Sequence, residues 1–137
     1  MKSQSEAFLD RWHRIVAERD VEALGQVLAG DVTMGAPPYF QKLSGHDLVQ
    51  HLLGIIINTI EGFTYHREWA DGRELALEFT GEIDGKGLQG IDLITLDAEN
   101  RLVNLDVMIR PLNALVALRD RVAPQMADYL ARSAKTD

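Results

Sequence analysis

The second half of the chain alternates polar and apolar side chains with a period of two residues, with short breaks, from Phe63 to Arg110. The breaks are Ala-Asp-Gly, Asp-Gly-Lys and Asp-Ala-Glu-Asn, which are typical of tight turns between strands. Successive side chains of a strand point to opposite faces of a sheet. The pattern therefore predicts an antiparallel sheet with one apolar face, formed by residues 63–70, 73–84, 87–97 and 101–110.

Apolar residues at helical spacing in the rest of the chain predict the helices that cover this face. Two capping boxes, Ser3 with Glu6 and Ser44 with Asp47, open the first and third of them. A strand followed by a loop is expected for residues 31–43 because Pro37 and Pro38 interrupt it. The predicted helices span residues 3–19, 20–30, 44–60 and 111–130, with Pro124 bending or interrupting the last and residues 132–137 frayed.

Length and composition describe one ordinary globular domain over residues 1–137, with 46% hydrophobic and 26% charged residues. The net charge of −7 and the lack of a basic run argue against nucleic acid and anionic membranes as partners. The sequence has no cysteine, so disulfides and thiolate chemistry are excluded. Without an apolar signal region at the N-terminus, a cytoplasmic protein is expected.

Asp92 lies on the face of its predicted strand that is otherwise apolar. A carboxylate in this position is solvated at a strand edge, paired in the core, or placed for chemistry. Burial without a cation would raise its pKa, so that the carboxyl group could donate a proton or a hydrogen bond near neutral pH. Arg67 shares the apolar face by the same alternation and would lower that pKa if it reached the carboxylate.

Other chemical motifs have simpler explanations. Residues 85–90 spell G-x-G-x-x-G, but they lie between two strands and open no helix, so a hairpin turn is expected. The four histidines share no common face, and no metal site is predicted. Glu78 and Asp106 fall on the face opposite Asp92, where they would line the outer surface or a dimer interface near Arg110.

Taken together, these elements resemble the nuclear transport factor 2-like superfamily, and within it the SnoaL-like proteins. The matching segments are "FLDRWHRIVAERDVEALGQVLAGDVTM", "SGHDLVQHL" and the strands that end in Arg110-Pro111, roughly residues 5–120. The resemblance implies an α+β, cone-shaped fold in which N-terminal helices pack on a curved antiparallel sheet and enclose an apolar pocket. It also implies a frequent homodimer across the outer sheet face. Relatives include isomerases, cyclases, epoxide hydrolases and binding modules, so the fold does not define the activity.

The residues of the implied site match the family unevenly. Asp92 stands where ketosteroid isomerase keeps a protonated aspartic acid in its oxyanion hole. Trp12 replaces the oxyanion-hole tyrosine and Ala36 replaces the general base, which argues against steroid isomerisation by that mechanism. Gly90 stands where the epoxide hydrolases of this fold need an arginine. Cyclase or aldol-type chemistry is the enzymatic function that the resemblance contradicts least.

We therefore expect a cofactor-independent enzyme that performs cyclase- or isomerase-like acid–base chemistry on a small hydrophobic compound, with Asp92 as acid/base or oxyanion donor. The alternative is a non-catalytic binding module or dimeric accessory protein, which the missing base at Ala36 supports. A third possibility is an interaction protein that uses the outer sheet face. Expected partners are a small hydrophobic molecule and a second copy of the chain, without cofactor, metal, nucleic acid or membrane. The side chains expected to contact the ligand are Trp12, Tyr39, Phe40, Phe63, Tyr65, Phe79, Leu105 and Val107.

Overall fold

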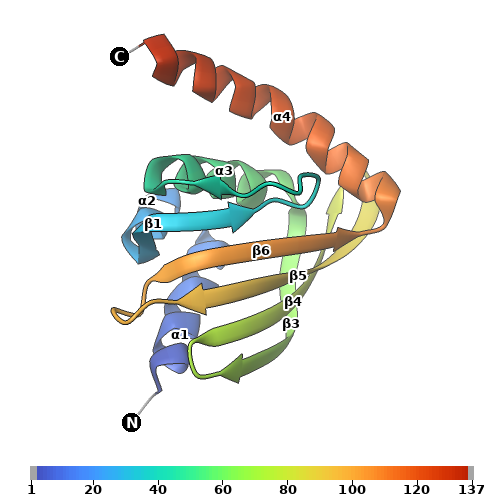
Figure 1. Ribbon diagram of the computed structural model, residues 1–137. Helices are drawn as coiled ribbons and strands as arrows, with labels where there is room; N and C mark the ends of the chain where they lie inside the picture. Colours follow the sequence, from blue (N-terminus) through green and yellow to red (C-terminus); the bar gives the residue numbers. More distant parts are fainter. Residues whose placement is uncertain (1–2, 136–137) are drawn as a thin grey trace.

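The computed structural model describes residues 3–135, which form helices on one side of a curved sheet (Figure 1). The fold is α+β, as predicted. In chain order the elements are α1 (Gln4–Glu18), α2 (Val21–Val27), β1 (Leu28–Gly35), β2 (Leu43–Ser44), α3 (His46–Thr59), β3 (Glu61–Asp71), β4 (Glu74–Ile83), β5 (Lys86–Leu96), β6 (Leu102–Arg110) and α4 (Leu112–Lys135).

The sheet has the strand order β2-β1-β6-β5-β4-β3. The four predicted strands β3 to β6 form an antiparallel meander, and Asp84 and Gly85 make the β4–β5 turn with φ angles of 50° and 76°. The prediction of a wholly antiparallel sheet is wrong, because β1 pairs parallel to β6 and carries β2 antiparallel on its other edge. The sheet is therefore mixed.

Helices α1 and α2 begin where the capping residues predict. The Ser3 hydroxyl accepts from the Glu6 N–H at 3.2 Å, and the Asp20 carboxylate accepts from the Ala23 N–H at 3.1 Å. Arg19 ends α1 in the left-handed region with a φ of 53°. Helix α2 ends at Val27, before Gly30, because the chain already enters β1 at Leu28.

The predicted cap of α3 is wrong. Gly45, with a φ of 113°, is the N-cap, and no side chain caps the helix. Ser44 instead belongs to β2, opposite Thr33. His46, at the first position of α3, bonds through its two ring nitrogens to the Asp47 carboxylate and to the Gly25 carbonyl, which ties α3 to α2.

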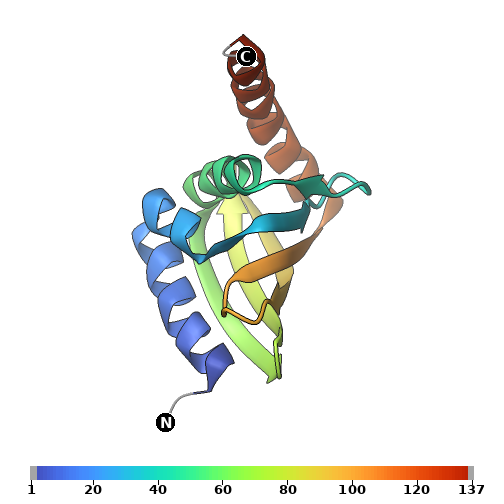
Figure 2. The ribbon, with the colours of Figure 1, turned by 60° about the vertical axis from the view of Figure 1, so that its left-hand side comes forward.

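Figure 2 shows α1 along the inner side of the curved sheet, α3 across its upper end, and α4 rising beyond α3. The core between these layers is apolar, and Phe8, Ile15, Leu77 and Phe79 are almost completely buried in it. Pro124 lies inside α4, which continues through it as one helix. No helix in residues 3–135 is long and apolar enough to cross a membrane.

A register shift in β3 reverses the side-chain alternation after Tyr65. Glu68 then lies opposite the buried Leu77 and contacts His13 of α1, which places it on the inner face. The prediction that Arg67 shares the apolar face with Asp92 is therefore wrong. The Arg67 guanidinium lies on the outer face, where it donates two hydrogen bonds of 2.7 Å to Glu78. This pairing lowers the pKa of Glu78 to about 2.

Gly90 has no side chain, and the ring of Phe79 occupies the space where a Cβ of residue 90 would lie. A Cβ at position 90 would lie 2.3 Å from Cζ of Phe79 and 2.8 Å from the Met108 carbonyl oxygen. A larger side chain at position 90 would therefore displace the ring.

We predict that Gly90→Ala lowers the free energy of unfolding by about 1–3 kcal/mol, the usual cost of overpacking a core. Urea denaturation measures the loss. Gly87→Ala is the matched control on the same strand, because a Cβ there meets nothing within 4 Å. Equal stability of the two variants would show that Phe79 moves aside without cost.

Candidate active site

Asp92 lies in the middle of β5, between Leu77 of β4 and Val107 of β6, and its side chain is buried in the inner face of the sheet. Its Oδ2 accepts a hydrogen bond of 2.6 Å from the Tyr65 hydroxyl. That hydroxyl accepts a hydrogen bond of 2.9 Å from the Trp12 indole N–H. The polar chain therefore runs from α1 through β3 to β5.

The surroundings of Asp92 and Tyr65 favour the uncharged forms of both side chains. Burial raises the pKa of Asp92 to about 7, although the hydrogen bond from Tyr65 acts in the opposite direction. Burial and the nearby Asp92 raise the pKa of Tyr65 well above its ordinary value, so the hydroxyl keeps its proton. As the sequence predicts in the absence of a cation, Asp92 is a carboxyl group that titrates near neutral pH.

A cavity of about 30 Å³ lies beside Asp92. Such a volume has room for no more than a few water molecules. Phe63 stacks on Phe79 at 4.6 Å between ring centroids, and the ring edge of Tyr65 meets Phe63 at 5.0 Å. The structure brings together around this cavity six of the eight side chains predicted to contact a ligand: Trp12, Phe63, Tyr65, Phe79, Leu105 and Val107.

The other two predicted ligand contacts lie outside the cavity. Tyr39 is 55% exposed and lines a separate groove, whereas Phe40 is fully exposed and lines neither this groove nor the cavity. Both follow the double proline after β1. Ala36 lines the same groove as Tyr39 and not the cavity of Asp92.

Two features of the site were not identified from the sequence. Tyr65 was expected to contact the ligand but not to donate to Asp92, although both share the inner face. The His13 ring contacts the Glu68 carboxylate beside Tyr65, with 5.2 Å between the ring centroids of His13 and Tyr65. Because the register of β3 shifts after Tyr65, simple strand alternation does not predict this pair. Residues 3–135 contain no cluster of three potential metal ligands.

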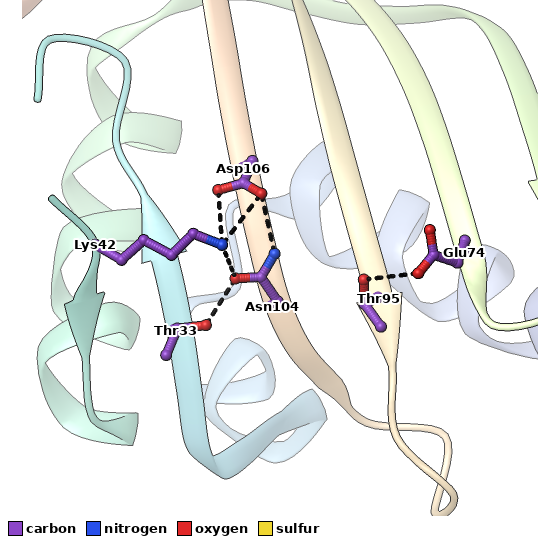
Figure 3. A network of polar contacts seen from close by, with 6 residues as sticks. All are labelled: Thr33, Lys42, Glu74, Thr95, Asn104 and Asp106. Carbon is purple, nitrogen blue, oxygen red and sulfur yellow. Dashed lines mark hydrogen bonds and ion pairs between the residues drawn. The ribbon is translucent and has the colours of Figure 1, made fainter. Parts of the chain in front are cut away.

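A polar network on β6 anchors the segment between β1 and β2 (Figure 3). The Lys42 ammonium donates to Oδ1 of Asn104 at 2.9 Å and to the Asp106 carboxylate at 3.3 Å. The Thr33 hydroxyl donates to the same Asn104 oxygen at 2.7 Å. Gly35 makes room for this network, since a Cβ there would lie 2.4 Å from Asp106.

Comparison with solved structures identifies the class of protein. The chain is similar to a steroid delta-isomerase from Pseudomonas aeruginosa, with 34% identity and a TM-score of 0.88 over 96% of this chain and 97% of that one. It is also similar to an uncharacterised protein with a cystatin-like fold from Silicibacter pomeroyi DSS-3. That chain is 30% identical with a TM-score of 0.83, and the match covers 86% of this chain and 84% of that one.

A more distant structure, the epoxide hydrolase/cyclase-like enzyme SalBIII of salinomycin pyran ring formation, shares the fold. Its identity is 16% and its TM-score 0.66, over 80% of this chain and 92% of that one. No protein-family model and no curated protein matches the sequence. The fold is that of the isomerase- and cyclase-like proteins. The chain belongs to the same superfamily as the steroid delta-isomerase from Pseudomonas aeruginosa, and it has the nuclear transport factor 2-like fold.

The raised pKa of Asp92 makes the stability of the fold depend on pH. The folded state holds this proton more tightly than the unfolded state, whose pKa is near 3.8. The contribution of Asp92 to stability is therefore complete below about pH 4 and is lost as the pH rises through about 7. A shift of this size corresponds to at most about 4 kcal/mol.

We predict that Asp92→Asn is more stable than the native protein, by a smaller margin at about pH 5 than at about pH 8.5. The amide removes the buried charge and keeps an oxygen that can accept from Tyr65. Urea denaturation at the two pH values measures the difference. A large loss of stability in the variant at pH 8.5 would mean that the ionised carboxylate is a structural anchor.

Proposed function

We propose that this protein is a cofactor-independent enzyme that performs isomerase- or cyclase-like acid–base chemistry on a small hydrophobic carbonyl compound. The observation that carries the proposal is the buried carboxyl group of Asp92 at an apolar cavity, with a pKa of about 7. Groups with perturbed pKa values in cavities are candidates for catalysis.

The direction of the hydrogen bonds suggests how Asp92 acts. Trp12 donates to Tyr65, and Tyr65 donates to Oδ2 of Asp92. No donor among the described residues reaches Oδ1. A proton on Oδ1 would therefore be free to bond to a carbonyl oxygen of a ligand in the cavity. Such a donor stabilises the negative charge that forms on this oxygen when a neighbouring carbon loses a proton.

The proton from carbon needs an acceptor, and the cavity offers few. Tyr65 holds its own proton, and position 36 carries an alanine. Asp92 in its ionised form is the remaining ionisable group among the described residues that line the cavity. The same carboxyl group is therefore proposed in one of two roles. As the acid/base, ionised Asp92 takes the proton from the α-carbon and returns it to the γ-carbon. As the oxyanion donor, it keeps its own proton while a water molecule from the solvent takes the α-proton and returns one to the γ-carbon, and the pH dependence of the rate separates the two roles.

The relatives support this class of chemistry without defining the substrate. One solved structure is described as a steroid delta-isomerase and another as an epoxide hydrolase/cyclase-like enzyme. Because position 36 carries an alanine and no carboxylate, we propose that Asp92 acts without a separate carboxylate base. We infer a substrate whose reacting carbon is already acidified by its carbonyl group.

The activity is tested with cyclohex-3-enone, whose carbon–carbon double bond moves into conjugation when the α-carbon loses a proton and the γ-carbon gains one. We predict that Asp92→Leu lowers kcat/KM by about 10²–10³-fold, the usual effect of losing an oxyanion donor. The absorbance of the conjugated product measures the rate. If the protonated form is active, kcat/KM falls as the pH rises above 7, whereas a base would make it rise.

Asp92→Asn separates donation from proton transfer, since the amide donates a hydrogen bond but exchanges no proton. Activity retained in Asp92→Asn and lost in Asp92→Leu supports the donor role, and loss in both supports acid/base catalysis. Equal rates for the native protein and both variants would overturn the proposal.

A non-catalytic binding protein is the second candidate. The missing carboxylate at Ala36 favours it, because a protein without a separate base can hold a ligand without transforming it. Binding of cyclohex-3-enone without turnover by the native protein would support this function.

The outer sheet face is proposed to join two copies of the chain. Trp69 is 50% exposed and Met108 is 56% exposed there, around the ion pair of Arg67 with Glu78. Exposed apolar groups on one face can pair by a two-fold axis. We predict that light scattering at tens of micromolar gives twice the mass of one chain, and that Met108→Glu gives one. A native monomer at this concentration would contradict the dimer.

A further inference from the structure

The hydrogen bonds that end at Asp92 run in one direction, and the first donor determines that direction. The indole N–H of Trp12 can donate a hydrogen bond but cannot accept one. It lies 2.9 Å from the hydroxyl oxygen of Tyr65, which therefore accepts from it. The hydroxyl has a single proton, and this proton is donated to Oδ2 of Asp92 at 2.6 Å.

The same geometry determines which oxygen of Asp92 carries the proton of the neutral carboxyl group. Because Oδ2 accepts from Tyr65, a proton on Oδ2 would meet the tyrosine proton head-on. The carboxyl proton therefore lies on Oδ1, for which residues 3–135 supply no hydrogen-bond partner. An unpaired proton on a buried group is costly, so some feature of the structure must keep it there.

The opposite arrangement would be favoured without the indole N–H. The Tyr65 hydroxyl could then rotate and accept a hydrogen bond from the carboxyl group. A carboxyl O–H is a stronger donor than a phenol O–H, as its lower pKa shows. The proton of Asp92 would then lie on Oδ2, bonded to Tyr65 and no longer available to a ligand.

The core holds the indole of Trp12 in the position that this role requires. Trp12 is only 3% exposed. The ring of Phe8, one turn earlier on α1, stacks on it with 5.6 Å between the ring centroids. The N–H is therefore a fixed donor to the tyrosine hydroxyl.

The other groups around Asp92 do not impose this direction. Asp92 and Tyr65 are the only ionisable side chains among the described residues that line the cavity, and the remaining lining from α1, α3, β1, β3, β4 and β6 is apolar apart from Trp12. His13 of α1 meets the ring of Tyr65 by its edge and contacts Glu68 of β3. Neither of these two side chains bonds to the tyrosine hydroxyl.

We propose that Trp12 is a positioning residue, whose indole N–H fixes the direction of the Tyr65 hydroxyl and thereby keeps the proton of Asp92 on Oδ1. This inference deepens the proposed function, on which the catalytic value of the Oδ1 proton rests. The position of the proton itself can be measured without any substrate.

The test observes the carboxyl group of Asp92 by infrared spectroscopy at about pH 5, below its pKa of about 7. Subtracting the spectrum of the same protein with Asp92→Asn isolates the carbonyl band. Two changes remove the indole N–H: Trp12→Phe, and benzothienylalanine at position 12, which keeps the shape of the indole with sulfur in place of the N–H. Both are repeated in Tyr65→Phe as the matched background, and circular dichroism checks that each protein is folded.

We expect both changes at position 12 to move the carbonyl band to higher wavenumber. In the native protein the C=O group is at Oδ2 and accepts from Tyr65, whereas in the variants it is at Oδ1 and accepts from no protein group. The pH dependence of the same band should show the pKa of Asp92 raised by about one unit, the size of one hydrogen bond. In Tyr65→Phe, where no hydroxyl transmits the effect, the same changes should move neither the band nor the pKa.

Two spectroscopic results would overturn the inference. One is a band and a pKa that stay unchanged when the N–H is removed. The other is an equal change with and without the Tyr65 hydroxyl, which would mean that Trp12 acts by packing or by excluding water.

The activity is a separate measurement on the same proteins. If the spectra change as expected but the native protein does not isomerise cyclohex-3-enone, the proposed activity is overturned and the role of Trp12 in placing the proton is supported. If the native protein isomerises this compound but the spectra do not respond to position 12, the inference is overturned and the proposed activity stands.

Discussion

The burial of one carboxyl group constrains how α1 and the sheet fit together. Asp92 lies on a central strand, so its desolvation must be offset by hydrogen bonds from neighbouring elements. Tyr65 on β3 donates one hydrogen bond to Asp92, and Trp12 on α1 donates another to the tyrosine hydroxyl. The hydrogen bond of Trp12 therefore connects α1 to β3 beside Asp92. Burial under these elements is the largest cause of the raised pKa of Asp92.

The parts of the fold that depend on neighbouring residues could be predicted from the sequence, and those that depend on distant ones could not. Alternation located the strands β3 to β6 and placed Asp92 on the inner face, and the caps at Ser3 and Asp20 located α1 and α2. The register shift in β3 has no marker in the residues after Tyr65, so simple alternation put Arg67 on the wrong face. The parallel pairing of β1 with β6 joins segments that are distant in the sequence, and no local sequence pattern predicts it.

The same distinction holds for the candidate site, where some residues could be placed from the sequence and others could not. Six aromatic and aliphatic side chains surround Asp92 because helical spacing and strand parity already place them on one inner surface. Tyr39 and Phe40 lie apart because the double proline turns the chain away from the cavity. The groove that Tyr39 lines depends on the path of α4 above α3, which is set by contacts such as Tyr129 with His51. Periodicity could identify the apolar face of α4 but not the space that this face leaves open.

The apolar surroundings and the acidity of Asp92 are physically linked. The cavity leaves the carboxyl group poorly hydrated, and desolvation is the largest cause of its raised pKa. An opening that admitted bulk water would lower the pKa and remove the proton at neutral pH. For the function proposed above, an apolar ligand that kept water out while it entered would preserve the protonated form of Asp92, whereas a strongly hydrated ligand would bring the water that ionises it.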